Sequence, residues 1–262
     1  MRVAVVVLLA LAMGLLLSAP SGERAGSVVR GDLAGQPVRL TLPTGTSTPK
    51  GLVMWFHGQG GSVNDRVDGP FLRALTRDGY AIASSSFHYQ SWGNEASTED
   101  TVRLTEWAED QVGLPVTLWV SGSMGGSISL NAMLHGVTPP SCWYGVKPAI
   151  SLNRMDAVPT GNKFIALAYG GTVPAERNPV RNVADLPADV RYRVVASPED
   201  TWVPINENGG ALISQLDDRG VDATYVAATG RHEDPSHWDS GDLVDFARSC
   251  DGSSPVSESA TD

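Results

Sequence analysis

The chain has 262 residues, of which 42% are hydrophobic and 18% charged. This balance is typical of a globular protein long enough to form one domain with a substantial core. Its formal net charge of -10 argues against nucleic acid and anionic membrane surfaces as partners, because both are themselves negatively charged.

The first 25 residues have the composition of a secretory signal peptide. Arg2 precedes an apolar run over residues 3–17, and small and polar residues follow that run. The run is short for a membrane-spanning helix, no cysteine follows it, and no twin arginine precedes it. We therefore expect cleavage after Ala19 or Ala25 and a secreted or extracytoplasmic protein with no stable membrane span. The alternative is an uncleaved N-terminal anchor.

The remaining chain predicts one α/β domain over residues 26–249, in which strands and helices alternate. Residue 98 is the expected N-cap of one of the helices, and residues 139–146 are expected to form a loop. Residues 153–191 lack clear periodicity and are predicted to form a small cap or lid. Residues 250–262 are predicted to be a disordered acidic tail. The expected strands cover residues 28–33, 38–42, 52–56, 80–84, 116–120, 149–152, 194–196 and 223–228, and the expected helices lie near residues 71–79, 98–111, 127–136, 211–218 and 243–247.

An abrupt change of pattern surrounds Ser123. The apolar run over residues 116–120 ends in Ser-Gly-Ser-Met-Gly-Gly (residues 121–126), and a helical pattern begins directly afterwards. A strand, a sharp turn and a helix with a serine at the turn are the layout of a nucleophile elbow. Such a turn needs small residues two positions before and after the serine. Ser121 and Gly125 meet this need, although Ser121 departs from the usual glycine.

Three further groups follow predicted strands. They are His-Gly-Gln-Gly-Gly (57–61), Asp-Thr-Trp-Val-Pro (200–204) and Gly-Arg-His (230–232). In a doubly wound, mostly parallel sheet, ligands bind beyond the carboxyl ends of the strands. We therefore expect all three groups to meet Ser123 at one edge of the sheet.

With these four motifs, the chain from about residue 28 to residue 248 resembles the α/β-hydrolase superfamily, in particular its secreted serine esterases and lipases. The family order of nucleophile, acid and histidine is kept. The resemblance implies Ser123 as the nucleophile, His232 as the general base and acid, and Asp200 as the residue that orients the imidazole. It also implies an oxyanion hole formed by the backbone N–H groups of Met124 and Gln59.

Alternatives remain for the base and for the nearby acidic residues. His237 lies five residues beyond His232 and is the competing base. The two histidines could also be metal ligands beside Glu233 and Asp239, but Pro235 breaks any helix that would align them. We therefore expect no metal site. We also expect no cofactor, because hydrolysis by an activated serine needs none.

The sequence also offers alternatives for the catalytic acid, and two further histidines need an interpretation. Asp156 follows the preceding predicted strand, and Glu199 adjoins Asp200, so both compete with Asp200 as the acid. His57 is expected to support the oxyanion loop through hydrogen bonds. His88 is expected to be a loop residue rather than a catalyst.

Three tryptophans, Trp92, Trp202 and Trp238, fall in loops near the predicted active edge. They are interpreted either as structural packing or as an apolar wall that binds an acyl or aryl group of the substrate. In an oxidising compartment, the pair Cys142 and Cys250 suggests one disulfide, with two buried thiols as the alternative.

The sequence therefore predicts a secreted serine hydrolase that cleaves carboxylic esters of small molecules or lipids. A peptidase and an acyltransferase of the same fold are alternatives that the residues leave open. A catalytically silent binding domain is the third alternative, and the presence of all three expected catalytic residues argues against it.

Overall fold

The computed structural model describes residues 26–46 and 48–251. The predicted signal peptide (1–25) and residues 252–262 of the predicted tail lie outside the described residues. The strands are β1 Val28–Leu33, β2 Gln36–Thr41, β3 Gly51–Phe56, β4 Tyr80–Ser85, β5 Val116–Gly122, β6 Cys142–Val146, β7 Arg191–Ala196 and β8 Ala223–Ala227. The α-helices are α1 Pro70–Arg77, α2 Glu95–Val112, α3 Gly125–Leu134, α4 Gly161–Tyr169, α5 Gly209–Asp217 and α6 Ser240–Cys250.

All described strands belong to one eight-stranded sheet with the order β1-β2-β4-β3-β5-β6-β7-β8. The first hairpin, β1 and β2, is antiparallel, and β2 also pairs with β4 in antiparallel orientation. Every other pair is parallel. The carboxyl ends of β3 and of β5 to β8 therefore lie along one edge, as the sequence predicts.

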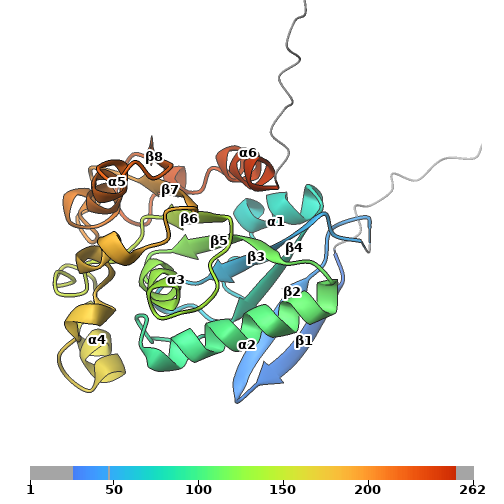
Figure 1. Cartoon of the computed structure of the whole chain (residues 1–262), viewed down its shortest axis with the longest axis horizontal. Helices are drawn as coiled ribbons and strands as arrows, with labels where there is room; N and C mark the ends of the chain where they lie inside the picture. The colour runs from blue at the N-terminus through green and yellow to red at the C-terminus, as the bar shows by residue number, and fades with distance from the viewer. Residues whose placement is uncertain (1–25, 47, 252–262) are drawn as a thin grey trace, which may run out of the picture.

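Helices cover both faces of this sheet (Figure 1). On one face, α1 and α6 lie side by side and pack Leu72 and Leu243 against the sheet, both fully buried. On the other face, α2, α3 and α5 bury Leu104, Ile128 and Leu212. Strands that are buried on both faces are expected where helices form both outer layers.

The position of one strand and one helix boundary differ from the prediction. Residues 142–146, expected to be a loop, form the central strand β6, whereas residues 149–152 form no strand. Helix α2 begins at Glu95 rather than at residue 98, because the side chain of Asn94 accepts a hydrogen bond from the N–H of Ser97. Asn94 is thus the N-cap, and Thr98 lies inside the first turn.

The segment predicted as a cap contains α4 and three short 3-10 turns at Ala175–Arg177, Pro179–Arg181 and Val183–Asp185. Figure 1 shows α4 outside the layers of the sheet, beyond α3. The part of the chain that the structure describes contains no helix long and apolar enough to cross a membrane.

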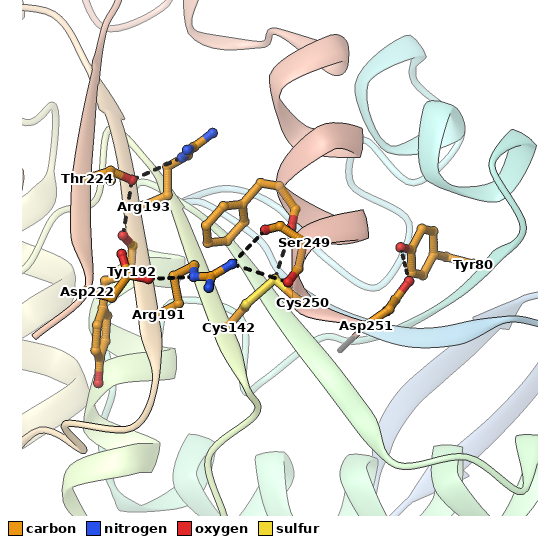
Figure 2. The surroundings of a disulfide bond; sticks show 11 residues. Tyr80, Cys142, Arg191, Tyr192, Arg193, Asp222, Thr224, Ser249, Cys250 and Asp251 are labelled. Carbon is orange, nitrogen blue, oxygen red and sulfur yellow. Dashed lines mark hydrogen bonds and ion pairs between the residues drawn. A yellow bond between two sulfur atoms is a disulfide. The ribbon is translucent and has the colours of Figure 1, made fainter. Parts of the chain in front are cut away.

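The expected disulfide between Cys142 and Cys250 is present (Figure 2). It joins the first residue of β6 to the last residue of α6, with a Cα–Cα distance of 6.0 Å. A crosslink that closes a loop of 108 residues restricts the unfolded chain and stabilises the fold by on the order of 4 kcal/mol.

Candidate active site

Ser123 lies at the turn between β5 and α3, with a φ of +50°. Its backbone is held on both sides, since its N–H donates to the carbonyl of Val146 (3.0 Å) and its carbonyl accepts from Ala149 (2.9 Å). A Cβ atom at Gly125 would lie 2.2 Å from the carbonyl oxygen of Phe56, so only glycine fits there. Ser121 is fully buried, and its hydroxyl lies 2.8 Å from that of Ser129.

His232 and Asp200 form a hydrogen-bonded chain with Ser123. Nε2 of His232 lies 3.1 Å from Oγ of Ser123, and Nδ1 lies 2.7 Å from Oδ2 of Asp200. His232 and Asp200 are 5% and 3% exposed. Ser123 follows β5, Asp200 follows β7 and His232 follows β8. These strands are parallel, so their carboxyl ends bring the three residues together at one edge, as the sequence predicts.

The carboxylate of Asp200 is fixed through both of its oxygens. Oδ1 accepts the N–H groups of Trp202 (2.9 Å) and Val203 (3.1 Å), while Oδ2 faces His232. Burial alone would raise the pKa of Asp200, but the hydrogen bonds from His232 and from these backbone groups outweigh it and lower the pKa. Asp200 is therefore held as a carboxylate that can orient the imidazole.

Two backbone N–H groups next to Ser123 are available to a ligand. Among the described residues, the N–H groups of Gln59 and Met124 have no hydrogen-bond acceptor. Gln59 lines the same cavity as Ser123, and its side chain donates to the carbonyl of Pro159 (2.8 Å). His57 supports this loop, since its ring nitrogens lie 2.8 Å and 3.0 Å from the carbonyl oxygens of Gly58 and Ser86.

Ser123 opens into a cavity of about 390 Å³, which is the size of a small-molecule site. Trp202 and Trp238 line this cavity, and the ring of Trp202 lies 5.2 Å from that of His232. Trp55, which the sequence did not single out, lines it as well. Trp92 does not, because its side chain is fully buried in the core.

The competing residues are not hydrogen-bonded to Ser123. Nδ1 of His237 lies 3.0 Å from the backbone oxygen of Asp234, and the side-chain partner of Ser123 among the described residues is His232. Asp156 is exposed and bonds Asn162 (2.6 Å). Glu199 is exposed too. Among the described residues, no group of three or more potential ligands is arranged to hold a metal ion.

Lys147 is a cavity residue that the sequence analysis missed. It directly follows β6, is 3% exposed, and its ammonium group donates to the backbone carbonyl of His232. Burial lowers its pKa, and the nearby carboxylate of Glu233 acts in the opposite direction. A lysine directly after a strand at the active edge is a detectable signal, but it depends on placing that strand at residues 142–146.

The sequence matches no family model and no curated protein, whereas many solved structures share the fold. An esterase of the bacterial hormone-sensitive lipase family has a TM-score of 0.69 and 19% identity, over 87% of this chain and 86% of that one. The esterase domain of a Rhodothermus marinus protein has a TM-score of 0.64 and 19% identity, over 86% and 99%. A puromycin-hydrolysing peptidase of Mycobacterium tuberculosis has a TM-score of 0.65 and 16% identity, over 84% and 38%. The likeness confirms the predicted α/β-hydrolase fold.

Proposed function

We propose that this α/β-hydrolase-fold protein is a serine hydrolase that cleaves carboxylic esters of small molecules through an acyl-enzyme on Ser123. The observation that carries the proposal is the chain of hydrogen bonds from Ser123 through His232 to Asp200 at the wall of a cavity. Esterases are among the similar structures, which favours an ester over other acyl compounds.

In the first half of the reaction, Oγ of Ser123 attacks the ester carbonyl carbon while Nε2 of His232 takes the hydroxyl proton. Asp200 holds the proton on Nδ1 and stabilises the imidazolium. The carbonyl oxygen becomes negatively charged and accepts hydrogen bonds from the unpaired N–H groups of Gln59 and Met124. Losing one such donor typically costs about 3 kcal/mol of transition-state stabilisation.

The tetrahedral intermediate then collapses. The bond to the alcohol oxygen breaks, and His232 returns its proton to that oxygen, so the alcohol leaves and the acyl group stays on Ser123. A water molecule then attacks the acyl carbon while His232 takes its proton. The bond to Oγ of Ser123 breaks, and His232 returns the proton to that oxygen. The products are the carboxylic acid and free Ser123.

Labelling with a fluorophosphonate, followed by mass spectrometry of the adduct, tests the proposal. We expect one adduct on Ser123 that is absent in Ser123→Ala and in His232→Ala, with both variants showing the melting temperature of a folded protein. An unlabelled, folded wild-type protein would overturn the proposal. A panel of p-nitrophenyl esters of increasing acyl length, together with aminoacyl amides, separates a small-molecule esterase from a lipid esterase and from a peptidase.

We also propose that the protein is secreted, on the evidence of its first 25 residues alone. Expression of the full chain in a bacterial host is expected to yield extracytoplasmic protein that begins at Pro20 or Gly26. An intact N-terminus on membrane-bound protein would instead indicate the anchored form.

A further inference from the structure

Ester hydrolysis by Ser123 does not require an ammonium group, yet one lies in the cavity wall. The side chain of Lys147 is 3% exposed and lines the same cavity as Ser123. An ammonium group has three N–H donors. Within the described chain, the ammonium group donates to the backbone oxygen of His232. It also forms an ion pair with Glu233, whose nearest carboxylate oxygen lies 3.7 Å from Nζ and whose side chain is 64% exposed.

The fold holds Lys147 in this position at a cost. Its φ is +42°, which lies in the left-handed region that a lysine rarely adopts. Burying an ammonium group whose carboxylate partner is largely exposed to solvent is also unfavourable. Strained backbone and buried charge are both concentrated at functional sites. Lys147 combines the two beside the candidate nucleophile.

The surroundings of Lys147 favour an anion over a cation. The guanidinium carbon of Arg66 lies 4.0 Å from the ring centroid of Trp238, and Nζ of Lys147 lies 5.2 Å from it. The indole therefore already contacts two cations, which leaves it poorly suited to a third. The carboxylate of Glu233 lies 3.7 Å from Nζ of Lys147 and 3.9 Å from the guanidinium of Arg66. Its side chain is 64% exposed, so solvent screens its charge. Asp65 also lines the cavity; burial raises its pKa, and the charge of Arg66 acts in the opposite direction.

We propose that Lys147, assisted by Arg66, binds a carboxylate on the acyl group of the substrate, so that the enzyme prefers monoesters of dicarboxylic acids. This inference rests on the proposed ester hydrolysis at Ser123. The acyl side is assigned because Lys147 is buried. The acyl group stays attached to Ser123 while the alcohol departs to solvent, and an enclosed subsite suits the group that stays.

Two 4-nitrophenyl esters that differ only in charge test this assignment. One carries an adipoyl monoacid, whose four methylenes keep its carboxylate from attacking its own ester, and the other carries the corresponding terminal carboxamide. The quantity measured is the ratio of kcat/KM for the carboxylate to kcat/KM for the carboxamide. We expect the wild-type ratio to be above one. In Lys147→Met the ratio should fall by about tenfold, the size expected for one charged hydrogen bond.

Glu233→Gln provides the opposite change. It removes the carboxylate that competes for both cations, so the ratio should rise. Glu99→Gln is its matched control, because Glu99 is 57% exposed, pairs with Arg103, and lies on α2 outside the cavity. That control should leave the ratio unchanged. Since Glu233 is exposed, its variant should fold even where Lys147→Met does not.

The outcomes separate this inference from the proposed function. A wild-type ratio near one, or a ratio that neither variant changes, would overturn the carboxylate subsite while leaving ester hydrolysis intact. An equal loss for both esters in Lys147→Met would assign Lys147 only to holding the backbone of His232. No cleavage of either ester, together with no fluorophosphonate label, would instead overturn the proposed function itself.

Discussion

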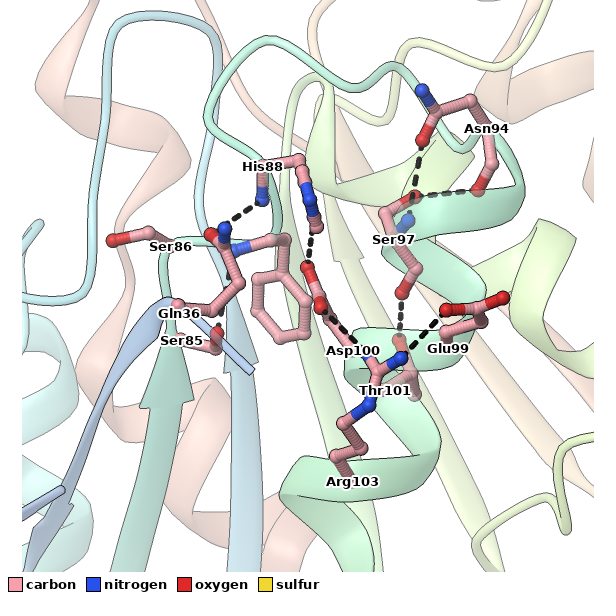
Figure 3. Close-up of polar contacts among 12 residues, drawn as sticks. Gln36, Ser85, Ser86, His88, Asn94, Ser97, Glu99, Asp100, Thr101 and Arg103 are labelled. Carbon is pink, nitrogen blue, oxygen red and sulfur yellow. Dashed lines mark hydrogen bonds and ion pairs between the residues drawn. The ribbon is translucent and has the colours of Figure 1, made fainter. Parts of the chain in front are cut away.

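Two histidine–aspartate pairs in this protein have nearly the same geometry. Nδ1 of His232 lies 2.7 Å from Asp200, and Nδ1 of His88 lies 2.6 Å from Asp100. The second pair joins the loop after β4 to helix α2 (Figure 3). Both aspartate side chains are 1% exposed. The contact between histidine and aspartate therefore does not distinguish them.

Their second partners differ. The other oxygen of Asp200 accepts two backbone N–H groups, and the pKa of Asp200 is lowered despite burial, which alone would raise it. The other oxygen of Asp100 accepts one hydrogen bond from Arg103 (3.2 Å). Burial raises the pKa of Asp100, and His88 and Arg103 offset this only in part. Besides its histidine, Asp200 thus has two backbone donors that lower its pKa, whereas Asp100 has Arg103, which lowers its pKa, and Glu99, which raises it.

The far ring nitrogens differ as well. Nε2 of His232 faces Ser123 inside a cavity, whereas the side chain of His88 is 43% exposed and its Nε2 has no partner among the described residues. A histidine–aspartate pair becomes a candidate catalyst only where the fold places a nucleophile on its open side. Here the strained turn at Ser123 does so.

Removing each histidine in turn should give the largest contrast. His232→Ala is expected to lower kcat for a p-nitrophenyl ester by about 10⁶-fold, because the serine loses its base. His88→Ala should leave kcat within about twofold, since exposed positions away from the site contribute little. Steady-state kinetics on both variants checks this. Comparable losses in the two would remove the functional distinction between the pairs.

A second variant should move Ser123 away from Nε2 of His232. The His232–Asp200 pair would then lack a nucleophile, as the His88–Asp100 pair does. In Gly125→Ala, the new Cβ would meet the carbonyl oxygen of Phe56 at 2.2 Å, so the turn must shift. Misplacing a reacting group by about 1 Å can cost about a hundredfold in rate, and we expect a loss of that size in kcat. Gly241→Ala is the control, because its Cβ would meet only an aspartate side-chain oxygen, at 3.2 Å. Wild-type kcat in Gly125→Ala would contradict the steric account.

The sequence is most informative where chain order alone brings residues together. Ser123, Asp200 and His232 each follow a strand of a parallel sheet, so the direction of the strands places them at one edge. The elbow at Ser123 is predictable because steric limits allow few residue types around it. The loop that contains Gln59 is predictable too, because it is rich in glycine and directly follows a buried strand.

Side-chain direction and short strands are harder to predict. Trp92 occupies an active-edge loop in the sequence, yet its φ of +50° and its burial place it in the core. Residues 142–146 follow two prolines and include a glycine, so they are typical of a loop until neighbouring strands pair with them on both sides. Because the sequence does not predict that strand, Lys147 is not recognised as a residue at the end of a strand. The place of Trp92 and the strand at residues 142–146 both depend on contacts between residues distant in sequence.

The acid dependence of stability should distinguish the two aspartates. A lowered pKa means that Asp200 contributes stability above the ordinary value of 3.8 and loses it as pH falls through its folded pKa. A raised pKa means that the contribution of Asp100 is fully present below 3.8 and declines as pH rises through its folded pKa.

Urea unfolding of Asp200→Asn, Asp100→Asn and wild type at a series of pH values measures these contributions. The difference between wild type and Asp200→Asn should shrink with acid, and the difference for Asp100→Asn should grow. The expected change is about 1.4 kcal/mol for each unit of pKa shift. Slopes of the same sign for both variants would contradict the assigned directions.

The smallest effect is expected at Ser121, the residue that departs from the usual glycine before the nucleophile. Its hydroxyl lies 2.8 Å from that of Ser129, which also bonds Trp143 and the carbonyl of Gly125. Ser121→Ala removes one of several partners of Ser129 and keeps a small side chain two positions before Ser123. We expect a loss of about 1 kcal/mol in the free energy of unfolding and unchanged kcat. A large loss of kcat with normal stability would show that Ser121 takes part in the reaction and does more than fill space beneath the turn.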